Sequence, residues 1–294
     1  MSVMTRLRNY GSLVTLAHTV FAMPFAGAAV VLSRGVPHLP LTPARVVAML
    51  VCMVAARSCA MAYNRYADRD VDAQNPRTQN RHIPRGVVSP REALLLTIAA
   101  GAVFLGAAAT LGTAPLVLAP LVLVVILGYS HAKRFTWASH AWLGLALALA
   151  PGGAWIAAGA APSLPIVLFM GAVLTWLFGF DILYSLQDEA FDRESALHSV
   201  PARFGVRRAL WLSSVAHVAT PILLGLAGLL LGRGLLYGVA VALTAVLLAY
   251  EHALVGKGDL SKINRAFFDV NAWLSVGFFV LTFADECVRS GARQ

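Results

Sequence analysis

The chain has 294 residues, of which 59% are hydrophobic and only 13% carry a charge. Soluble domains carry about 25% charged residues, so this composition excludes an ordinary soluble domain and indicates a membrane protein. The formal net charge of +9 comes from basic residues that lie mostly in loops between apolar stretches. This distribution favours a role in membrane orientation and argues against nucleic-acid binding.

Nine apolar runs, each long enough to cross a hydrocarbon core of about 30 Å, predict transmembrane helices. They lie near 13–32, 43–63, 92–112, 115–131, 140–160, 164–186, 209–231, 234–254 and 266–284. The first run is too long for a signal peptide and is interpreted as a retained span. The break at 112–116 is very short and predicts a tight hairpin of the third and fourth helices. We therefore expect an all-α polytopic membrane protein with about nine transmembrane helices.

The distribution of lysine and arginine predicts the side of the membrane on which each loop lies. The N-terminus and the loops after the second, fourth, sixth and eighth helices hold seventeen basic residues, whereas the other side holds five. Cytoplasmic loops carry an excess of basic residues, so the N-terminus is predicted to be cytoplasmic and the C-terminus to lie outside. This asymmetry is consistent with an odd number of spans.

Charged residues appear directly after the second apolar run, in YNRYADRDVDAQNPRTQNR at 63–81. Asn64, Asp68 and Asp72 are spaced by four residues, so a helix would place them on one face. Asp70 lies two residues off this face and is predicted to face solvent or to pair with an arginine.

The loop after the sixth run repeats this pattern. In YSLQDEAFDRESALHSVPARFG at 184–205, Tyr184, Asp188 and Asp192 have the same four-residue spacing. Both motifs continue into a Pro, Arg and Gly cluster, IPRG after the first and VPARFG after the second. The similarity predicts an internal duplication within a single transmembrane domain that covers 1–294.

Two aspartates on one helix face repel each other unless a cation neutralises them. Neighbouring arginines are one such partner, and a divalent metal is the other. Mg²⁺ prefers oxygen ligands and is commonly bound by one or two carboxylates together with substrate phosphates. The two Asp pairs are therefore predicted to hold Mg²⁺ ions that bridge to a diphosphate, while nearby arginines and lysines bind the remaining phosphate charge.

These motifs resemble those of the UbiA superfamily of intramembrane aromatic prenyltransferases. The resemblance extends to YSHAKRFT at 129–136 and to SVPARFG at 199–205, and it covers nearly the whole chain. It implies nine transmembrane helices around a central cavity in the bacterial cytoplasmic (inner) membrane, with Mg²⁺ as the cofactor. The implied reaction is transfer of a polyprenyl group from polyprenyl diphosphate to an aromatic acid in quinone biosynthesis.

Position by position, the resemblance assigns metal-binding and catalytic roles to four aspartates: Asp68, Asp72, Asp188 and Asp192. It assigns substrate binding to the residues that match the rest of the motifs: Asn64, Lys133, Arg134, Tyr184 and Gln187.

One departure from the family pattern concerns Arg65, because the common first motif begins with Asn-Asp. The form NRYADRDVDAQNPRTQNRHIPRG, together with HTVFAMPFA at 18–26, looks more like the subgroup associated with the futalosine route to menaquinone than like ubiquinone-type enzymes. This shifts the expected acceptor from 4-hydroxybenzoate toward a dihydroxynaphthoate.

Ionisable residues inside predicted spans are candidate functional residues, because a charge in hydrocarbon is costly. Arg57 lies seven residues before Asn64 and is a candidate partner for an acceptor carboxylate or for Asp181. Asp181 lies seven residues before Asp188 and is a candidate to orient an arginine or to accept the proton lost from the aromatic ring. His18 is a candidate contact for acceptor hydroxyls. Structural roles are assigned to three further histidines: His140, His198 and His252.

Other functions fit parts of the sequence. A transporter also has internal repeats and paired charges, but its charges would lie near the membrane midplane, whereas these aspartates are predicted at one face. A lipid-head-group or CDP-alcohol transferase uses membrane-edge aspartates in one dense run with glycines, which this chain lacks. Within the resembled superfamily, haem, homogentisate and a chlorophyll precursor are alternative acceptors.

Overall fold

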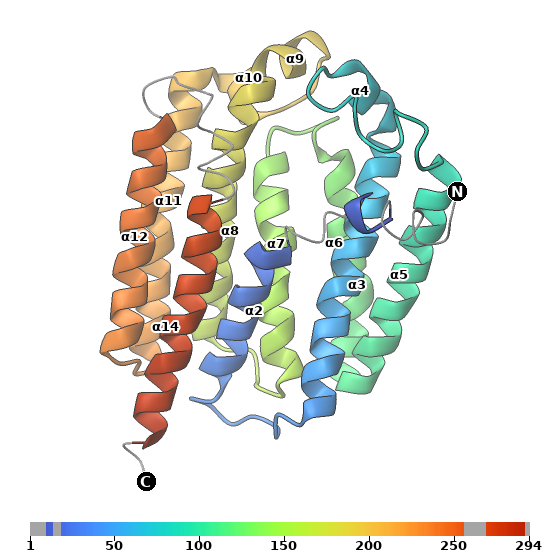
Figure 1. Ribbon diagram of the computed structural model, residues 1–294. Coiled ribbons are helices and arrows are strands. Elements are labelled where there is room, and N and C mark those ends of the chain that lie inside the picture. Colours follow the sequence, from blue (N-terminus) through green and yellow to red (C-terminus); the bar gives the residue numbers. More distant parts are fainter. Residues whose placement is uncertain (1–9, 14–18, 256–268, 292–294) are drawn as a thin grey trace. The chain divides into compact units, whose positions relative to one another are not determined.

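A computed structural model describes residues 10–13, 19–255 and 269–291 of the chain (Figure 1). Every regular element in these residues is a helix, which confirms the predicted all-α class. The chain forms two compact units: the first comprises Met1–Thr19 and Leu41–His131, and the second comprises Val20–Pro40 and Ala132–Gln294. Each unit has a hydrophobic core of its own.

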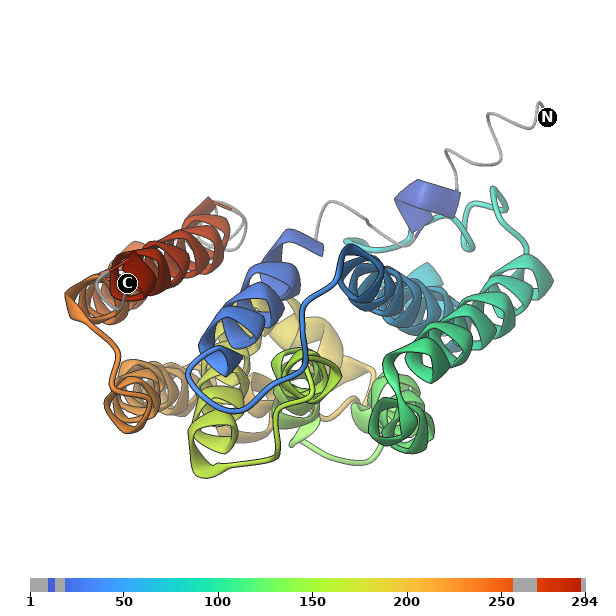
Figure 2. The same cartoon turned by 90° about the horizontal axis from the view of Figure 1, so that it is seen from below.

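After residue 40, the described part of the first unit contains three long helices and one short helix. These are α3 (Pro43–Ala67), α4 (Arg69–Gln74), α5 (Pro90–Leu111) and α6 (Thr113–Ala132). The helices α3 and α5 pack along each other, and Figure 2 shows them side by side in blue and teal. Small residues such as Ala55 and Ala108 are buried beside Phe104 and let neighbouring backbones approach closely.

Local sequence explains where the helices of the first unit begin and end. Pro43 and Pro90 occupy first-turn positions, where the backbone needs no donor. Ser89 and Glu92 form a capping box with both reciprocal hydrogen bonds at the start of α5. Gly112 has a φ of 131°, which favours glycine, and it alone separates α5 from α6. This one-residue turn confirms the predicted short break between the third and fourth helices.

The second unit holds the remaining long helices. These are α2 (Thr19–Ser33), α7 (Ser139–Ala157), α8 (Leu164–Ser185), α11 (Val206–Leu230), α12 (Leu235–Val255) and α14 (Asn271–Gly291), with the short η2 (Leu186–Asp188), α9 (Glu189–Glu194) and α10 (Val200–Phe204) between α8 and α11. The helix α8 packs against α7 and α11, and α12 packs against α11 and α14. An aromatic cluster lies in the core, where the ring centroid of Phe25 is 4.9 Å from that of Trp176 and 5.4 Å from that of Phe278.

Gly144 allows a close approach of α7 to α8. A Cβ added at this position would lie 2.6 Å from the backbone oxygen of Leu174, which cannot rotate away as a side chain would. Small residues are common where helices pack in membranes, because they let two backbones meet. This contact sets the spacing of the two helices that carry His140 and Asp181.

Each predicted span corresponds to a long helix within the described residues, and seven of these helices are long and apolar enough to cross a membrane. The other two are α2, whose apolar part is short at Ala22–Ser33, and α14, which is amphipathic. Large apolar side chains face outward, as Leu95, Val117 and Leu229 show with 65%, 69% and 78% exposure. Such a surface requires lipid to cover it.

Candidate active site

The first aspartate motif spans the junction of α3 and α4. Asp68 separates the two helices, with φ −94° and ψ 4° in the bridge region. Helical hydrogen bonds nevertheless continue across the break, from Asp68 N to Asn64 O at 2.9 Å and from Asp72 N to Asp68 O at 2.7 Å. The motif therefore keeps its four-residue periodicity although the helix is interrupted.

The side chains of the first motif form a charged, hydrogen-bonded cluster. Asn64 Nδ2 donates to Asp68 Oδ2 at 2.7 Å. The buried Asp72 accepts from Arg81 Nη1 at Oδ1, at 2.6 Å, and its Oδ2 lies 4.0 Å from Arg65 Nη1. Within the described residues, this Oδ2 is buried and accepts no hydrogen bond. Arginines thus neutralise part of the carboxylate charge and leave one oxygen for a further cation.

Asp70 lies apart from this cluster. Its side chain is 76% exposed, and its Oδ2 lies 3.4 Å from Arg69 Nη2. Both features agree with the prediction for this residue. Asp70 is therefore a matched control for its two motif neighbours.

The second motif has a backbone arrangement similar to that of the first, with the short 3-10 helix η2 inserted before the break. The helix α8 ends at Ser185, and Asp188, the last residue of η2, directly precedes α9 with φ −102° and ψ 3°, close to the values at Asp68. Asp188 and Asp192 are both buried. The repeated sequence pattern is thus accompanied by a repeated helix break at the equivalent aspartate.

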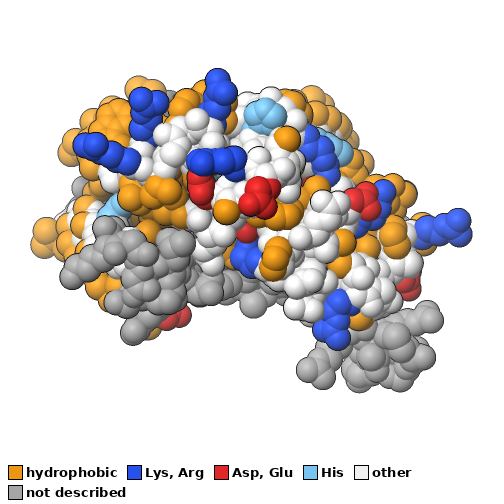
Figure 3. All heavy atoms as spheres, turned by 90° about the horizontal axis from the view of Figure 1, so that it is seen from above, with side chains coloured by type: hydrophobic (Ala, Val, Ile, Leu, Met, Phe, Trp, Pro, Cys, Tyr) orange, Lys and Arg blue, Asp and Glu red, His pale blue; other side chains and the backbone are white. Residues whose placement is uncertain are grey.

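Of the predicted basic pair, Lys133 lies near the second motif and Arg134 is exposed. The Nζ of Lys133 is 3.6 Å from Asp192 Oδ2, an oxygen that is buried and accepts no hydrogen bond in the described part of the chain. Gln187 Nε2 donates to the backbone oxygen of Tyr184 at 3.4 Å. Figure 3 views the molecule from above and shows basic and acidic side chains among hydrophobic ones on this face.

Arg57 is a partly buried residue in the middle of α3. Its Nε is buried without an acceptor among the described residues. A guanidinium in this state within a membrane-spanning helix favours an anionic ligand, and the planar guanidinium matches a carboxylate. His18, the other residue predicted to bind the acceptor, lies outside the described residues.

Asp181 pairs with His140 across the contact of α7 and α8. The two atoms Asp181 Oδ2 and His140 Nδ1 are 2.6 Å apart. The backbone N–H of Val200 lies 3.2 Å from His140 Nε2 and can only donate, so Nε2 is the acceptor and Nδ1 carries the proton. The imidazole is fully buried, whereas the Asp181 side chain is 16% exposed. The carboxylate partner of this histidine was not predicted, because no spacing pattern links residues 41 positions apart.

The same end of α7 joins two loops of the second unit. His198 N donates to Lys133 O at 2.7 Å, and Ser139 Oγ donates to His198 O at 3.4 Å. With the contact of His140 to Val200, these bonds connect the loop that carries Lys133 to the segment that follows α9. These hydrogen bonds therefore help to fix the position of the Lys133 side chain.

A second group of polar side chains is buried where α8, α11, α12 and α14 meet. Trp176 Nε1 donates to Asn271 Oδ1 at 2.7 Å, and Asn271 Nδ2 donates to Glu251 Oε1 at 3.2 Å. His217 contacts Trp176 O at 3.1 Å through Nε2 and His252 Nε2 at 3.0 Å through Nδ1. Glu251 Oε2 is buried and accepts no hydrogen bond from the described residues. This cluster links four helices of the second unit.

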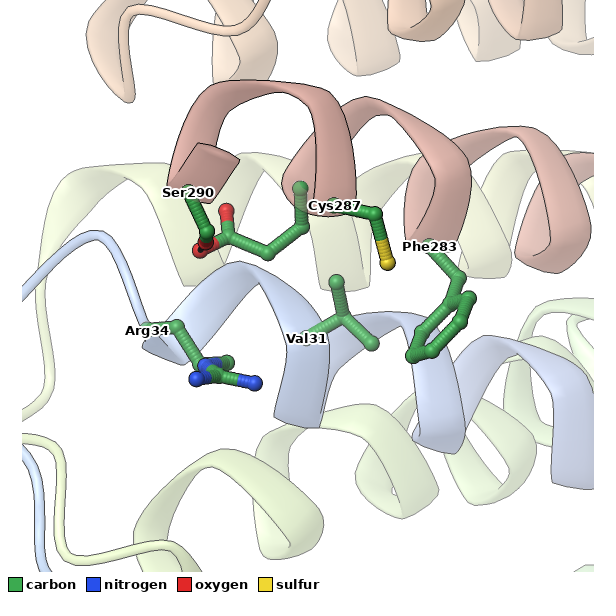
Figure 4. Close-up of a pocket in the computed structure, with 6 residues that line it drawn as sticks. Val31, Arg34, Phe283, Cys287 and Ser290 are labelled. Carbon is green, nitrogen blue, oxygen red and sulfur yellow. Dashed lines mark hydrogen bonds between the residues drawn. The ribbon is translucent and has the colours of Figure 1, made fainter. Parts of the chain in front are cut away.

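A shallow pocket of about 120 Å³ lies between α2 and α14 in the second unit (Figure 4). Six residues line it: Val31, Arg34, Phe283, Glu286, Cys287 and Ser290. None of the predicted site residues is among them, so the pocket is separate from the candidate active site.

The donors of both motifs fit Mg²⁺. Buried carboxylate oxygens without hydrogen bonds, at Asp72 and Asp192, are hard ligands of the kind this ion prefers. The described residues contain no group of three or more His, Cys, Asp or Glu that could hold a metal. Mg²⁺ usually completes its shell with water and substrate phosphates, so such a group is not required.

Residues 21–277 match the model of the UbiA prenyltransferase family. The chain belongs to this family. It is therefore a multi-pass membrane prenyltransferase, which confirms the resemblance and the enzyme class predicted from the sequence.

Relatives of this UbiA family member cover nearly its whole length. The 4-hydroxybenzoate octaprenyltransferase of Vibrio cholerae is 30% identical over 90% of this chain and 89% of that protein. The protein of the same name from Nitrosospira multiformis is 27% identical over 88% of each chain. The structure of a UbiA homolog from Aeropyrum pernix K1 is 34% identical, with a TM-score of 0.80 over 93% of this chain and 98% of that one. A UbiA homolog from Archaeoglobus fulgidus bound to GPP and Mg²⁺ shares the fold at 22% identity, with a TM-score of 0.75 over 95% and 99% of the chains.

Proposed function

We propose that this protein catalyses the Mg²⁺-dependent transfer of a polyprenyl group from polyprenyl diphosphate to an aromatic acid in quinone biosynthesis. The observation that carries the proposal is the pair of aspartate motifs. Each motif contains a buried carboxylate with one oxygen free of hydrogen bonds in the described chain and with a basic side chain nearby. A diphosphate with Mg²⁺ supplies the charges that such groups lack.

In this proposal each motif provides side chains that bind Mg²⁺ and diphosphate oxygens. Asp68, Asp72, Asp188 and Asp192 would hold Mg²⁺, which when bound adds positive charge that stabilises the leaving diphosphate. Arg65, Arg81 and Lys133, which contact the motif carboxylates, would bind phosphate oxygens directly. Asn64 fixes the orientation of Asp68 through its 2.7 Å hydrogen bond.

The acceptor would be oriented by Arg57, whose guanidinium pairs with the carboxylate of the aromatic acid. The bond between the allylic carbon and the diphosphate oxygen breaks, and the diphosphate leaves with the electron pair. An aromatic ring carbon forms the new bond to the allylic carbon, and the ring proton passes to the Asp181 carboxylate and then to solvent. Apolar helix walls exclude water, which would otherwise capture the allylic cation.

Two observations bear on the identity of the acceptor. The relatives from V. cholerae and N. multiformis are named 4-hydroxybenzoate octaprenyltransferases. The first motif, with Arg65 after Asn64, instead favours a dihydroxynaphthoate and a place in menaquinone biosynthesis. We propose an aromatic acid of one of these two types, with the protein in the inner membrane of a bacterium and its N-terminus in the cytoplasm.

The test is product analysis with protein purified into lipid nanodiscs. The protein is incubated with Mg²⁺, a mixture of polyprenyl diphosphates, and both aromatic acids in competition, and the products are identified by mass spectrometry. Asp68→Ala and Asp188→Ala should each lower turnover by about 10²-fold or more, as loss of a group that stabilises transition-state charge does. Asp70→Ala is the matched control and should keep wild-type turnover. Wild-type turnover in both motif variants, or equal turnover after Mg²⁺ is removed with EDTA, would refute the proposal.

A further inference from the structure

We propose that His140 is a positioning residue that holds the Asp181 carboxylate in the orientation needed to accept the ring proton. This inference rests on the proposed function. The geometry that supports it is the 2.6 Å hydrogen bond from His140 Nδ1 to Asp181 Oδ2. Within the described residues, the second oxygen of Asp181 makes no hydrogen bond, and the side chain is partly exposed.

The hydrogen bonds of His140 exclude a direct chemical role. The ring is fully buried, so it cannot reach a substrate. Its Nε2 accepts from the backbone N–H of Val200, which requires the imidazole to be neutral with its proton on Nδ1. Protonation would place two donors face to face at Nε2, so the ring is suited to donate one fixed hydrogen bond and unsuited to exchange protons.

Both neighbours of His140 are themselves fixed in place. Val200 is the first residue of α10, whose preceding Ser199 caps the helix through a hydrogen bond to Ala202 N. One turn along α7, Gly144 lies against the backbone of α8, so the helices cannot slide apart without loss of that contact. A hydrogen-bond partner behind a catalytic carboxylate commonly fixes the orientation of that carboxylate. His140, itself held in place, is such a partner for Asp181.

The two ring nitrogens can be tested separately with amide side chains. In His140→Asn the amide nitrogen takes the place of Nδ1 and keeps a donor to Asp181, but the acceptor for Val200 is lost. In His140→Gln the longer side chain takes the place of Nε2 and keeps an acceptor for Val200, but the donor to Asp181 is lost. The two variants therefore separate positioning of Asp181 from support of the α10 segment.

Turnover and KM for prenyl diphosphate are measured with both variants in nanodiscs. If His140 positions Asp181, His140→Gln should lower kcat by about 10²-fold, the loss that a misplacement of about 1 Å can cause, with KM for the diphosphate changed less than about twofold. His140→Asn should retain most of kcat. In an Asp181→Asn background, His140→Gln should cause no further loss, because the two residues act as one unit.

The opposite order, with His140→Asn the more damaged variant or with both variants equal, would overturn the proposal. Thermal unfolding and size-exclusion chromatography identify a variant that fails to fold. In that case the ¹⁵N spectrum of histidine-labelled wild-type protein decides, since the proposal requires Nδ1 protonated and Nε2 unprotonated at His140. A wild-type protein that prenylates no aromatic acid refutes the proposed function itself, whereas an active wild type with unaffected variants refutes only the role of His140.

Discussion

A single methyl group at Gly144 should disturb both the packing of α7 on α8 and the reaction. The added Cβ would lie 2.6 Å from Leu174 O, whereas an ordinary contact needs at least 3.4 Å. The backbones must therefore separate by about 0.8 Å, because neither contacting atom belongs to a flexible side chain. Overpacking of this kind costs about 1–3 kcal/mol of unfolding free energy.

The matched control is Gly153→Ala in the same helix, where an added Cβ meets no atom within 4 Å. Alanine is favoured over glycine inside a helix by about 1 kcal/mol, so this variant should be neutral or slightly stabilised. Thermal unfolding in detergent compares the two, and turnover reports on the distance between His140 and Asp181. A shift of this size can lower kcat by up to about 10²-fold. Equal melting temperatures for Gly144→Ala and Gly153→Ala would refute the reasoning.

Two further predictions concern residues outside the site. Arg233→Ala should destabilise the protein by about 3–5 kcal/mol, because it leaves the largely buried Glu286 carboxylate without its ion-pair partner. Thermal unfolding measures this loss, and the double change Arg233→Met with Glu286→Leu should recover most of it. A double variant as unstable as Arg233→Ala would contradict this account. Burial, and then the charges of Arg65 and Arg85, lower the pKa of His82 below its ordinary value of 6.5. The neutral form is thus favoured in the folded state, and the resulting stability is present above about pH 6.5 and is lost as the pH falls through the lower folded pKa. Between pH 6.5 and 5 the wild-type melting temperature should fall more steeply than that of His82→Gln; parallel curves would show that His82 does not contribute.

The positions of the helices along the chain could be predicted because they depend on local sequence. Apolar runs of membrane length, and the short break at Gly112, need no knowledge of distant residues. The two aspartate motifs were also predictable, since four-residue spacing survives the helix breaks at Asp68 and Asp188. The breaks themselves were not predicted. A single residue whose backbone adopts the bridge conformation interrupts the helix but leaves the spacing of the apolar residues unchanged.

Contacts between helices could not be predicted in the same way. The partner of Asp181 could not be read from the sequence because His140 lies on another helix, and the choice among several membrane histidines depends on how α7 and α8 pack. The same holds for the buried group at Trp176, Asn271 and Glu251, whose members come from three helices. The amphipathic α14 was predicted as an apolar span, because an apolar run alone does not show that the polar residues gather on one face of the helix.

The buried group around Glu251 has a consequence for synthesis of the protein. A carboxylate in a membrane-spanning helix disfavours insertion of that helix, and Glu251 lies near the C-terminal end of α12. The amide that donates to Glu251 belongs to Asn271, which leaves the ribosome twenty residues later. The helix α12 must therefore enter the membrane, or wait beside the translocon, before its own hydrogen-bond donor exists. Nascent chains that stop short of α14 would leave the Glu251 carboxylate without the amide donor of Asn271.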